Sequence, residues 1–216
     1  MLVIAAINHS LVGKMKEIDI KRALSYHLLK QGTTDVVFFE YPFHFGRRRA
    51  DIISSDAGMI TGYEIKSVND RIDRLGEQLE SYTLLFDYVY VVCDSKHLSA
   101  IRKKIPNRVG IYLCATSGVT KIRQAKQIKN FDSVVTLDAM PIEALRKDFK
   151  STGKSKLEIC KSIAHNHKRE QIKETYRKFI LQKYGAQTAH LKNETSELLT
   201  LDDVYSLSLA PNRLNS

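Results

Sequence analysis

The stretch from Arg47 to Tyr82 constrains the fold of this chain most strongly, because two β-type runs, a turn and a helical run follow one another without a break. Ala50–Ile53 and Met59–Ser67 are rich in Ile, Met and Tyr, and the Ser-Ser-Asp-Ala-Gly between them is typical of a turn. We therefore predict a β-hairpin. Such a hairpin brings Asp51 on its first strand close to Glu64 on its second strand.

The second strand of this hairpin carries charged residues in a pattern that suits catalysis. Alternate side chains of a strand share a face, so Glu64 and Lys66 point the same way, while Tyr63 and Ile65 point into the opposite layer. Two carboxylates a few Å apart repel each other unless a cation lies between them, and oxygen ligands suit Mg²⁺ or Mn²⁺ rather than zinc. Lys66 could hold or deprotonate the attacking water, or offset charge on a phosphate under attack. These groups suffice for phosphodiester hydrolysis.

The order of these residues resembles the D…(D/E)-x-K core of the PD-(D/E)XK nuclease superfamily, which here reads Asp51, then Glu64, Ile65 and Lys66. The helical run that follows resembles the QxxxY element of the RecB-like branch of that superfamily, with Gln78 and Tyr82. The resemblance covers roughly Lys14–Gly118. It departs from the name-giving motif at Ala50, where a proline is expected.

The resemblance implies a restriction-endonuclease-like core and a nuclease that needs Mg²⁺ or Mn²⁺ as its cofactor. The residues expected to be catalytic are Asp51, Glu64, Lys66, Gln78 and Tyr82. The residues expected to bind the metal are Asp51, Glu64, Ile65 and Glu17. By association, small proteins of this build act in phage and bacterial DNA repair, recombination or restriction.

The stretch Lys14–Gln31 predicts the first helix, because its apolar residues follow the spacing of one helical face: Ile20, Ala23, Leu24, His27 and Leu28. Glu17 precedes this stripe on the same face. It is either a first-turn acid favoured by the helix dipole, or a carboxylate that leans toward the metal site, as the acidic residue of the first helix does in many members of the superfamily. We expect His27 to pack in the core rather than to bind a metal.

Asp35–Tyr41 reads DVVFFEY and predicts a strand beside the first strand of the hairpin, across a turn at Pro42–Gly46. Glu40 on this strand is either an additional metal ligand or an edge residue, and we favour the edge residue. The position of the Glu40 side chain in the folded protein distinguishes a metal ligand from an edge residue.

The net charge of +10 predicts a polyanionic partner, and we expect nucleic acid. The resemblance implies DNA before RNA. Arg47, Arg48 and Arg49 enter the hairpin, so at least one should face a passing phosphate backbone, unless they only protect an edge strand. Arg71 is a fourth candidate for binding nucleic acid. Arg146–Lys192 holds 13 Lys and Arg against four Asp and Glu, a local charge of +9, and we expect it to carry much of the affinity.

The rest of the chain predicts the fold class. After a helix at Asp70–Leu85, two apolar strands at Phe86–Cys93 and Val109–Cys114 flank a short basic helix at His97–Lys104. Strand, helix and strand in this order form a parallel crossover, so the sheet combines an antiparallel hairpin with parallel strands. We predict an α/β fold in which helices flank a mixed central sheet, with a small C-terminal helical region.

From Pro141 onward helical patterns replace β-type runs, and three helices are predicted: Ile142–Phe149, Lys156–His165 and Glu170–Tyr184. The last has an apolar stripe that includes Ile172, Tyr176, Ile180 and Leu181. We divide the chain into a nuclease-like core, residues 1–140, and a basic, mainly helical region, residues 141–216.

Several other functions are disfavoured by what the sequence contains. No apolar run approaches the roughly 20 residues that cross a bilayer, so we expect no membrane partner. We expect Leu2–Ile7 to be a buried strand or a docked tail rather than a signal peptide. Three scattered cysteines make neither a disulfide scaffold nor a zinc site, which favours a reducing cytoplasm, and His165 and His167 read as part of a polar turn.

Two alternatives to the nuclease remain. One is a nucleic-acid-binding module that kept the fold and lost the chemistry, against which the intact Asp51, Glu64 and Lys66 argue. The other is a nucleotide-binding or metabolite-binding α/β protein, which is disfavoured because neither GxGxxG nor GxxxxGK[ST] occurs.

Overall fold

The computed structural model describes residues 15–194 and 200–208. Within them, six strands form one sheet in the order of the chain: β1 Thr34–Phe43, β2 Arg48–Asp56, β3 Met59–Lys66, β4 Tyr88–Asp94, β5 Gly110–Ala115 and β6 Gly118–Arg123. β1, β2 and β3 are antiparallel, β3, β4 and β5 are parallel, and β6 returns antiparallel to β5. The predicted α/β fold with a mixed central sheet is therefore confirmed. The prediction for Leu2–Ile7 lies outside the described residues.

The β2–β3 hairpin forms as the sequence predicts. Its two turn residues, Ala57 and Gly58, both have positive φ, 48° and 75°. Turns of this kind match the right-handed twist of the two strands, so they close tight hairpins. The resulting register pairs Ile52 with Tyr63, and Asp51 and Glu64 stand immediately beside that pair.

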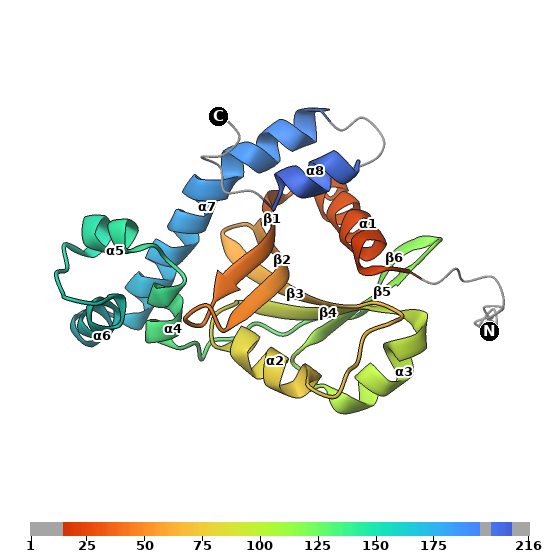
Figure 1. Ribbon diagram of the computed structural model, residues 1–216, viewed down its shortest axis with the longest axis horizontal. Helices are drawn as coiled ribbons and strands as arrows, with labels where there is room; N and C mark the ends of the chain where they lie inside the picture. The colour runs from red at the N-terminus through yellow and green to blue at the C-terminus, as the bar shows by residue number, and fades with distance from the viewer. Residues whose placement is uncertain (1–14, 195–199, 209–216) are drawn as a thin grey trace.

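Helices cover both faces of the sheet (Figure 1). On one face lie α1 Glu17–Lys30 and α8 Leu201–Ser206. Apolar side chains of α1, together with Leu207 just after α8, pack with residues such as Ile52, Tyr63 and Val92. On the other face lie α2 Leu75–Thr83, α3 Ser95–Lys104, α4 Ser133–Asp138, α5 Ile142–Phe149, α6 Lys156–Asn166 and most of α7 Arg169–Glu194. The core is therefore two apolar layers separated by the sheet.

The C-terminal helices share their apolar core with the sheet. Ile172, Tyr176 and Ile180 of α7 are fully buried in the same cluster as β1 and β4 residues, and α7 runs along β1 (Figure 1). Leu181, predicted to lie on the buried stripe, is instead 43% exposed. It is one position past Ile180, which turns it about 100° away from the sheet. Helix α7 also continues ten residues beyond the predicted end at Tyr184.

Two further boundaries differ from the sequence-based expectations. Pro42 lies within β1 rather than in a turn, which is tolerated because β1 is an edge strand. Helix α2 begins at Leu75 instead of Asp70, because the Asp70 carboxylate accepts hydrogen bonds from the backbone N–H of Ser67 at 2.7 Å and from its hydroxyl at 2.6 Å. Strand β6 and helix α4 were not anticipated. No helix in the described part of the chain combines the length and the apolar character needed to span a membrane.

Candidate active site

Glu64 is the most densely bonded carboxylate of the hairpin. It is 3% exposed, and three side chains of the predicted motif donate hydrogen bonds to it. Lys66 Nζ and Gln78 Nε2 reach Oε1 at 2.7 and 2.6 Å, and the Tyr82 hydroxyl reaches Oε2 at 2.6 Å. Gln78 and Tyr82 lie one helical turn apart on α2, which packs on the face of the sheet toward which Glu64 points. The four sequence-predicted residues therefore meet at one carboxylate.

Asp51 lies beside Glu64 on the neighbouring strand. Its Oδ2 accepts a hydrogen bond from the backbone N–H of Ile65 at 2.6 Å. Burial, followed by repulsion from the Glu64 carboxylate, raises the pKa of Asp51 to about 8. The hydrogen bond from Ile65 and the charge of Lys21 act in the opposite direction but do not cancel these effects. The free protein thus places two like charges where they oppose each other's ionisation.

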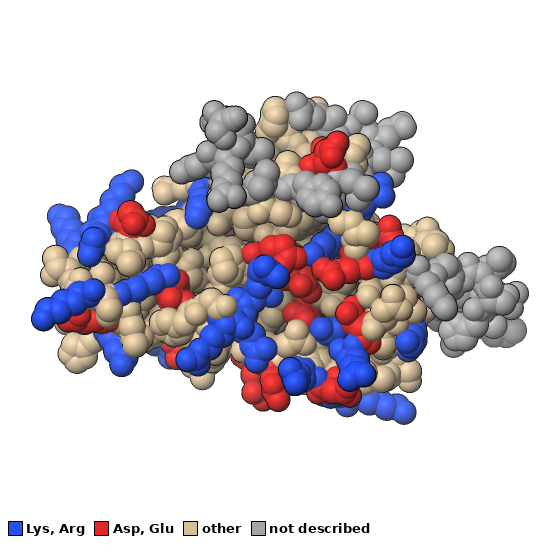
Figure 2. All heavy atoms as spheres, in the orientation of Figure 1, with Lys and Arg blue, Asp and Glu red and all other residues tan. Residues whose placement is uncertain are grey.

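A second group of acids adjoins Asp51 from the side of α1. Carboxylate oxygens of Glu17, Glu40 and Asp51 all lie within 4.8 Å of one another. Glu17 is an acid in the first turn of α1 and also lies beside Asp51, so its position fits both sequence-based alternatives. Glu40 lies beside Asp51 and belongs to edge strand β1. Metal binding by either carboxylate stays a prediction. Figure 2 shows acidic side chains gathered between the β1–β2 hairpin and α1.

A lysine that the sequence reasoning missed lies among these acids. Lys21 is 7% exposed, its Nζ lies 2.7 Å from Glu17 Oε1, and it also donates to Glu40 Oε1. Arg49 pairs with the other oxygen of Glu40 at 2.6 Å. The sequence could have predicted this ion pair, because Glu17 and Lys21 are four residues apart and therefore lie on one face of the helix.

At Glu40 on β1 and Asp51 on β2, side chains stop alternating regularly between the two faces of the sheet. Val36, Phe38, Tyr41 and Phe43 of β1 all belong to the same apolar layer, so the two-residue period is interrupted once, at Glu40. Glu40 has a positive φ of 54°, unusual for a non-glycine residue in a strand. On the paired strand β2, the side chains of Ala50 and Ile53 lie in the same apolar layer as these β1 residues, while Ile52 lies in the layer on the opposite face of the sheet. This local twist accounts for how edge strand β1 can contribute a carboxylate to the site.

The charges of the whole group do not balance. Four carboxylates are present, from Glu17, Glu40, Asp51 and Glu64, and three cations face them, from Lys21, Arg49 and Lys66. The acidic surplus is centred on Asp51, which has no ion pair of its own among the described residues.

These donors fit a hard divalent cation. Asp51 and Glu64 offer carboxylate oxygens, and burial of Asp51 beside the Glu64 carboxylate raises its pKa, an effect that a bound cation would oppose. Ile65 could contribute only its backbone carbonyl, because its side chain is buried in the opposite layer. Glu17 and Glu40 are already paired with Lys21, so they are ligands only if that lysine moves.

The other predicted residues occupy different settings. Arg47 and Arg71 are exposed, and Arg48 donates to the Ser81 hydroxyl of α2 at 3.3 Å. His27 packs edge-on against Tyr112, with ring centroids 5.7 Å apart, and bonds to Gln31. Burial, with a smaller effect of Lys121, lowers the pKa of His27. His27 is therefore half-buried between Tyr112 and Gln31.

The basic block at Arg146–Lys192 is partly engaged in internal contacts. Arg177 and Lys173 bind Asp87, Lys156 binds Asp138, and Lys178 pairs with Glu174. The exposed remainder lies on and around α5 and α6: Arg146, Lys147, Lys150, Lys154, Lys161 and Lys168. Figure 1 places these helices at the far end of the molecule from α1, so the strongest basic signal of the sequence lies away from the carboxylates.

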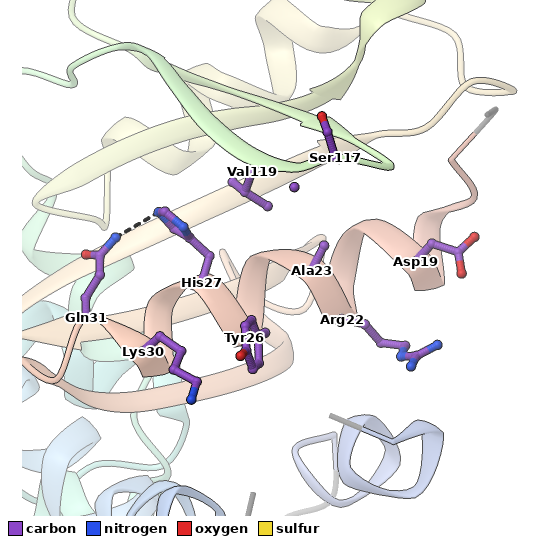
Figure 3. A pocket seen from close by; sticks show the side chains of 10 residues that line it. Asp19, Arg22, Ala23, Tyr26, His27, Lys30, Gln31, Ser117 and Val119 are labelled. Atoms are coloured by element: carbon purple, nitrogen blue, oxygen red, sulfur yellow. Dashed lines mark hydrogen bonds between the residues drawn. The ribbon is translucent and has the colours of Figure 1, made fainter. Parts of the chain in front are cut away.

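A hollow of about 610 Å³ between α1 and the β5–β6 turn is separate from this site (Figure 3). His27 points across it toward Val119, while Arg22 and Tyr26 lie on the other side of the helix. None of the four carboxylates described above lines it. The candidate chemistry therefore depends on the open hairpin surface rather than on this hollow.

Comparison with known proteins gives three matches. The family model described as "Bacteriophage P4 protein cII" matches residues 12–208. Protein cII of Enterobacteria phage P4 is 31% identical over 99 residues, which are 45% of this chain and 37% of that protein, so the match spans little more than a third of that relative. The SPO1766 protein of unknown function from Silicibacter pomeroyi aligns with 62% of this chain and 94% of its own, at 18% identity and a TM-score of 0.41.

The family match extends from before α1 to the end of α8, and so includes every residue of the candidate site. The chain therefore belongs to the bacteriophage P4 protein cII family.

Proposed function

We propose that this protein is a nuclease of the PD-(D/E)XK type that hydrolyses phosphodiester bonds, most readily in DNA, with Mg²⁺ or Mn²⁺. The observation that carries the proposal is the convergence of Lys66, Gln78 and Tyr82 on the buried Glu64 carboxylate, beside Asp51. A motif that matched by chance in the sequence would have no reason to join its members at 2.6–2.7 Å.

Asp51 and Glu64, with the backbone carbonyl of Ile65, would hold the metal. The bound ion would supply a Lewis acid for a phosphoryl oxygen and a more acidic water. Lys66 is held by Glu64 at 2.7 Å and carries a positive charge next to the place where negative charge develops on the phosphate. Alternatively, the Lys66 amine would orient the attacking water, or deprotonate it in the neutral form of the amine.

Gln78 and Tyr82 keep Glu64 in place. Burial and the charges of Glu64 and Asp51 raise the pKa of Tyr82 well above its usual range, so its hydroxyl stays protonated and always donates. The Gln78 amide donates to the oxygen that Lys66 also binds. Together the two side chains limit rotation of Glu64, which preorganises the carboxylate for a cation.

Lys21 would act as an internal counter-charge. It is buried between Glu17 and Glu40, and its charge lowers the pKa of Asp51. Lys21 and Arg49 offset Glu17 and Glu40, and Lys66 offsets Glu64, so Asp51 is the carboxylate left without an ion pair among the described residues.

Protein of this kind would work in the cytoplasm of a bacterial host, in phage or bacterial repair, recombination or restriction. Its three cysteines are buried and free, as is usual in a reducing compartment. Burial raises the pKa of the Cys93 and Cys114 thiols to about 12 and that of Cys160 to about 11, so none is poised to react.

The test incubates purified protein with labelled single- and double-stranded DNA and RNA, with Mg²⁺ or Mn²⁺ and in parallel with EDTA. We expect metal-dependent cutting. Asp51→Asn and Glu64→Gln keep the shape but remove charge, so each should reduce cleavage on the order of a thousandfold or more while nucleic-acid binding survives. Lys66→Ala should stop turnover and leave metal binding intact.

Glu143→Gln is a matched control, because Glu143 is an exposed acid on the distant helix α5 and should have no effect. Cutting that persists in EDTA or in Asp51→Asn would refute the site. Binding to nucleic acid without cleavage of any of the four substrates would favour a binding module instead.

A further inference from the structure

The tip of the β1–β2 hairpin presents an exposed aromatic ring on an unusual backbone. Phe45 is 40% exposed, and single exposed apolar side chains are common. The backbone around it is not common, because His44, Phe45 and Gly46 all have positive φ, at 54°, 58° and 72°. Non-glycine residues hold this conformation only where the surrounding structure enforces it, and such strain gathers at functional sites.

The hairpin tip is held in place from below. The carboxylate of Asp138, itself 6% exposed, accepts a hydrogen bond from the backbone N–H of Phe45 and pairs with Lys156 at 3.2 Å. One residue later, the carbonyl of Ala139 accepts a hydrogen bond from the Tyr41 hydroxyl at 2.6 Å. These contacts fix the strand and its tip to α4, so the Phe45 ring is kept outside the core.

Phe45 also borders a hollow whose walls are partly apolar and partly basic. This hollow of about 510 Å³ lies beside the hairpin, with Phe45, Pro42 and Met140 among its apolar walls and Lys156 and Lys183 among its basic ones. An aromatic face next to amines suits a nucleobase with its phosphate, because the base stacks and the phosphate is neutralised.

A basic path joins this tip to the candidate site. Arg47, Arg48 and Arg49 follow Phe45 along the chain, and Figure 2 shows basic side chains over the hairpin running up to the acidic ones. From Arg48, where β2 begins, to Asp51 the strand rises by three residues, roughly 10 Å. This is about the length of three stacked nucleotides at roughly 3.4 Å each.

We propose that Phe45 is a stacking platform for an unpaired base, and that the substrate is therefore a single strand or a single-stranded extension of a duplex. Bases inside a duplex are already stacked on their neighbours, so only an unpaired base can use the ring. The arginines contact the backbone between Phe45 and the carboxylates, which places the phosphodiester to be cut about three nucleotides beyond the nucleotide that lies at Arg48. The position of that bond rests on the proposed function; the binding does not.

The test measures binding in EDTA, where no cleavage occurs, by fluorescence anisotropy of a labelled 15-nucleotide thymidine strand and of a duplex of the same length. Phe45→Ala should weaken binding of the single strand about tenfold, equivalent to 1.4 kcal/mol, with the duplex changed less than twofold. Phe45→Trp should restore binding, and Phe45→Leu should not, because leucine keeps the apolar bulk and lacks the π-face. Leu181→Ala removes an equally exposed apolar side chain from α7 and should change neither affinity.

Unchanged single-strand binding in Phe45→Ala, or equal loss for both ligands, would overturn the platform. So would rescue by leucine as complete as by tryptophan, or a wild-type protein that does not bind the single strand. Phe45-dependent binding without any cleavage in Mg²⁺ would refute the proposed nuclease and leave the platform standing. Cleavage with Phe45-independent binding would refute the platform alone.

Discussion

Two groups of buried charges in this molecule have opposite balance. At the β3–β4 connection, Asp87 alone accepts a backbone hydrogen bond from Ile60 at 2.8 Å, two bonds from Arg177 at 3.1 and 2.6 Å, and an ion pair with Lys173 at 3.5 Å. At the hairpin, four carboxylates share three cations.

The pKa shifts in the two groups reflect this difference. Around Asp87, the group whose charged form is disfavoured is a cation: burial lowers the pKa of Lys173 to about 8, although the attraction of Asp87 opposes this shift. Around Glu64, the group whose charged form is disfavoured is an anion, because burial and the like charge of Glu64 raise the pKa of Asp51. The two cations of α7, Lys173 and Arg177, bind Asp87 beside the sheet, so these contacts hold α7 in place without any added ion. A surplus of acids suits the uptake of a cation, and this contrast separates the structural cluster from the candidate active site.

The largest expected effect comes from removing the acid of the structural group. Asp87→Ala leaves Lys173 buried without a counter-charge and Ile60 N–H without an acceptor, so we expect a loss of about 3–5 kcal/mol in the free energy of unfolding. Urea denaturation measures it. Glu174→Ala, which breaks only the exposed pair with Lys178, should leave stability unchanged. A small loss in Asp87→Ala would mean that this group does not anchor α7.

The next effect concerns the donors to Glu64. Hydrogen bonds to charged groups contribute about 1.5–3 kcal/mol, so Tyr82→Phe and Gln78→Ala should each slow cleavage roughly ten- to a hundredfold. Single-turnover rates measure this. Tyr63→Phe is the matched control, since it removes a buried hydroxyl that bonds to Ser54 at 3.1 Å on the opposite face of the sheet, and it should leave the rate unchanged. Full activity of both variants would reduce the QxxxY resemblance to coincidence.

A further effect concerns Lys21. Lys21→Met removes a cation from the acidic group, so the affinity for Mn²⁺, measured by calorimetry, should rise about tenfold, as expected for a repulsion of roughly 1–4 kcal/mol at close range. Lys30→Met on the same helix, where Lys30 is exposed over Tyr26, should bind Mn²⁺ like the wild type. An unchanged affinity for Mn²⁺ in Lys21→Met would show that this lysine does not repel the bound metal ion.

The last effect is a dependence of stability on pH in EDTA. Because the pKa of Asp51 is raised in the folded state, the folded protein binds more protons than the unfolded chain between about pH 4 and pH 8. Its contribution to stability is therefore present at low pH and is lost as pH rises through about 8. The fall in melting temperature over this range should be shallower in Asp51→Asn, and Mg²⁺ should flatten it in the wild type. Parallel curves for both proteins would contradict the coupling of Asp51 to Glu64.

Local sequence patterns predicted the sheet up to β5, apart from the boundaries of turns and helices. The alternation of β2 and β3 and the Ala-Gly turn place Asp51, Glu64 and Lys66 together, because the strand period and turn geometry act over a few residues. The QxxxY spacing likewise puts Gln78 and Tyr82 on one face of α2. The exposed, mixed pattern of β6 and the short α4 gave no comparable signal, since both are stabilised by the neighbours they pack on.

The sequence by itself determined the hairpin, the acids and amine of the motif and the excess of positive charge, all of which follow from residue type and short-range period. Only the tertiary structure decided that Lys21 lies among Glu17 and Glu40, that Glu40 turns into the site through a positive φ, and that part of the basic block serves the interior. Arg177 reaches Asp87 across 90 residues of chain. Such contacts depend on how α1, β1 and α7 pack on the sheet, and no local pattern encodes the distance between two side chains that folding brings together.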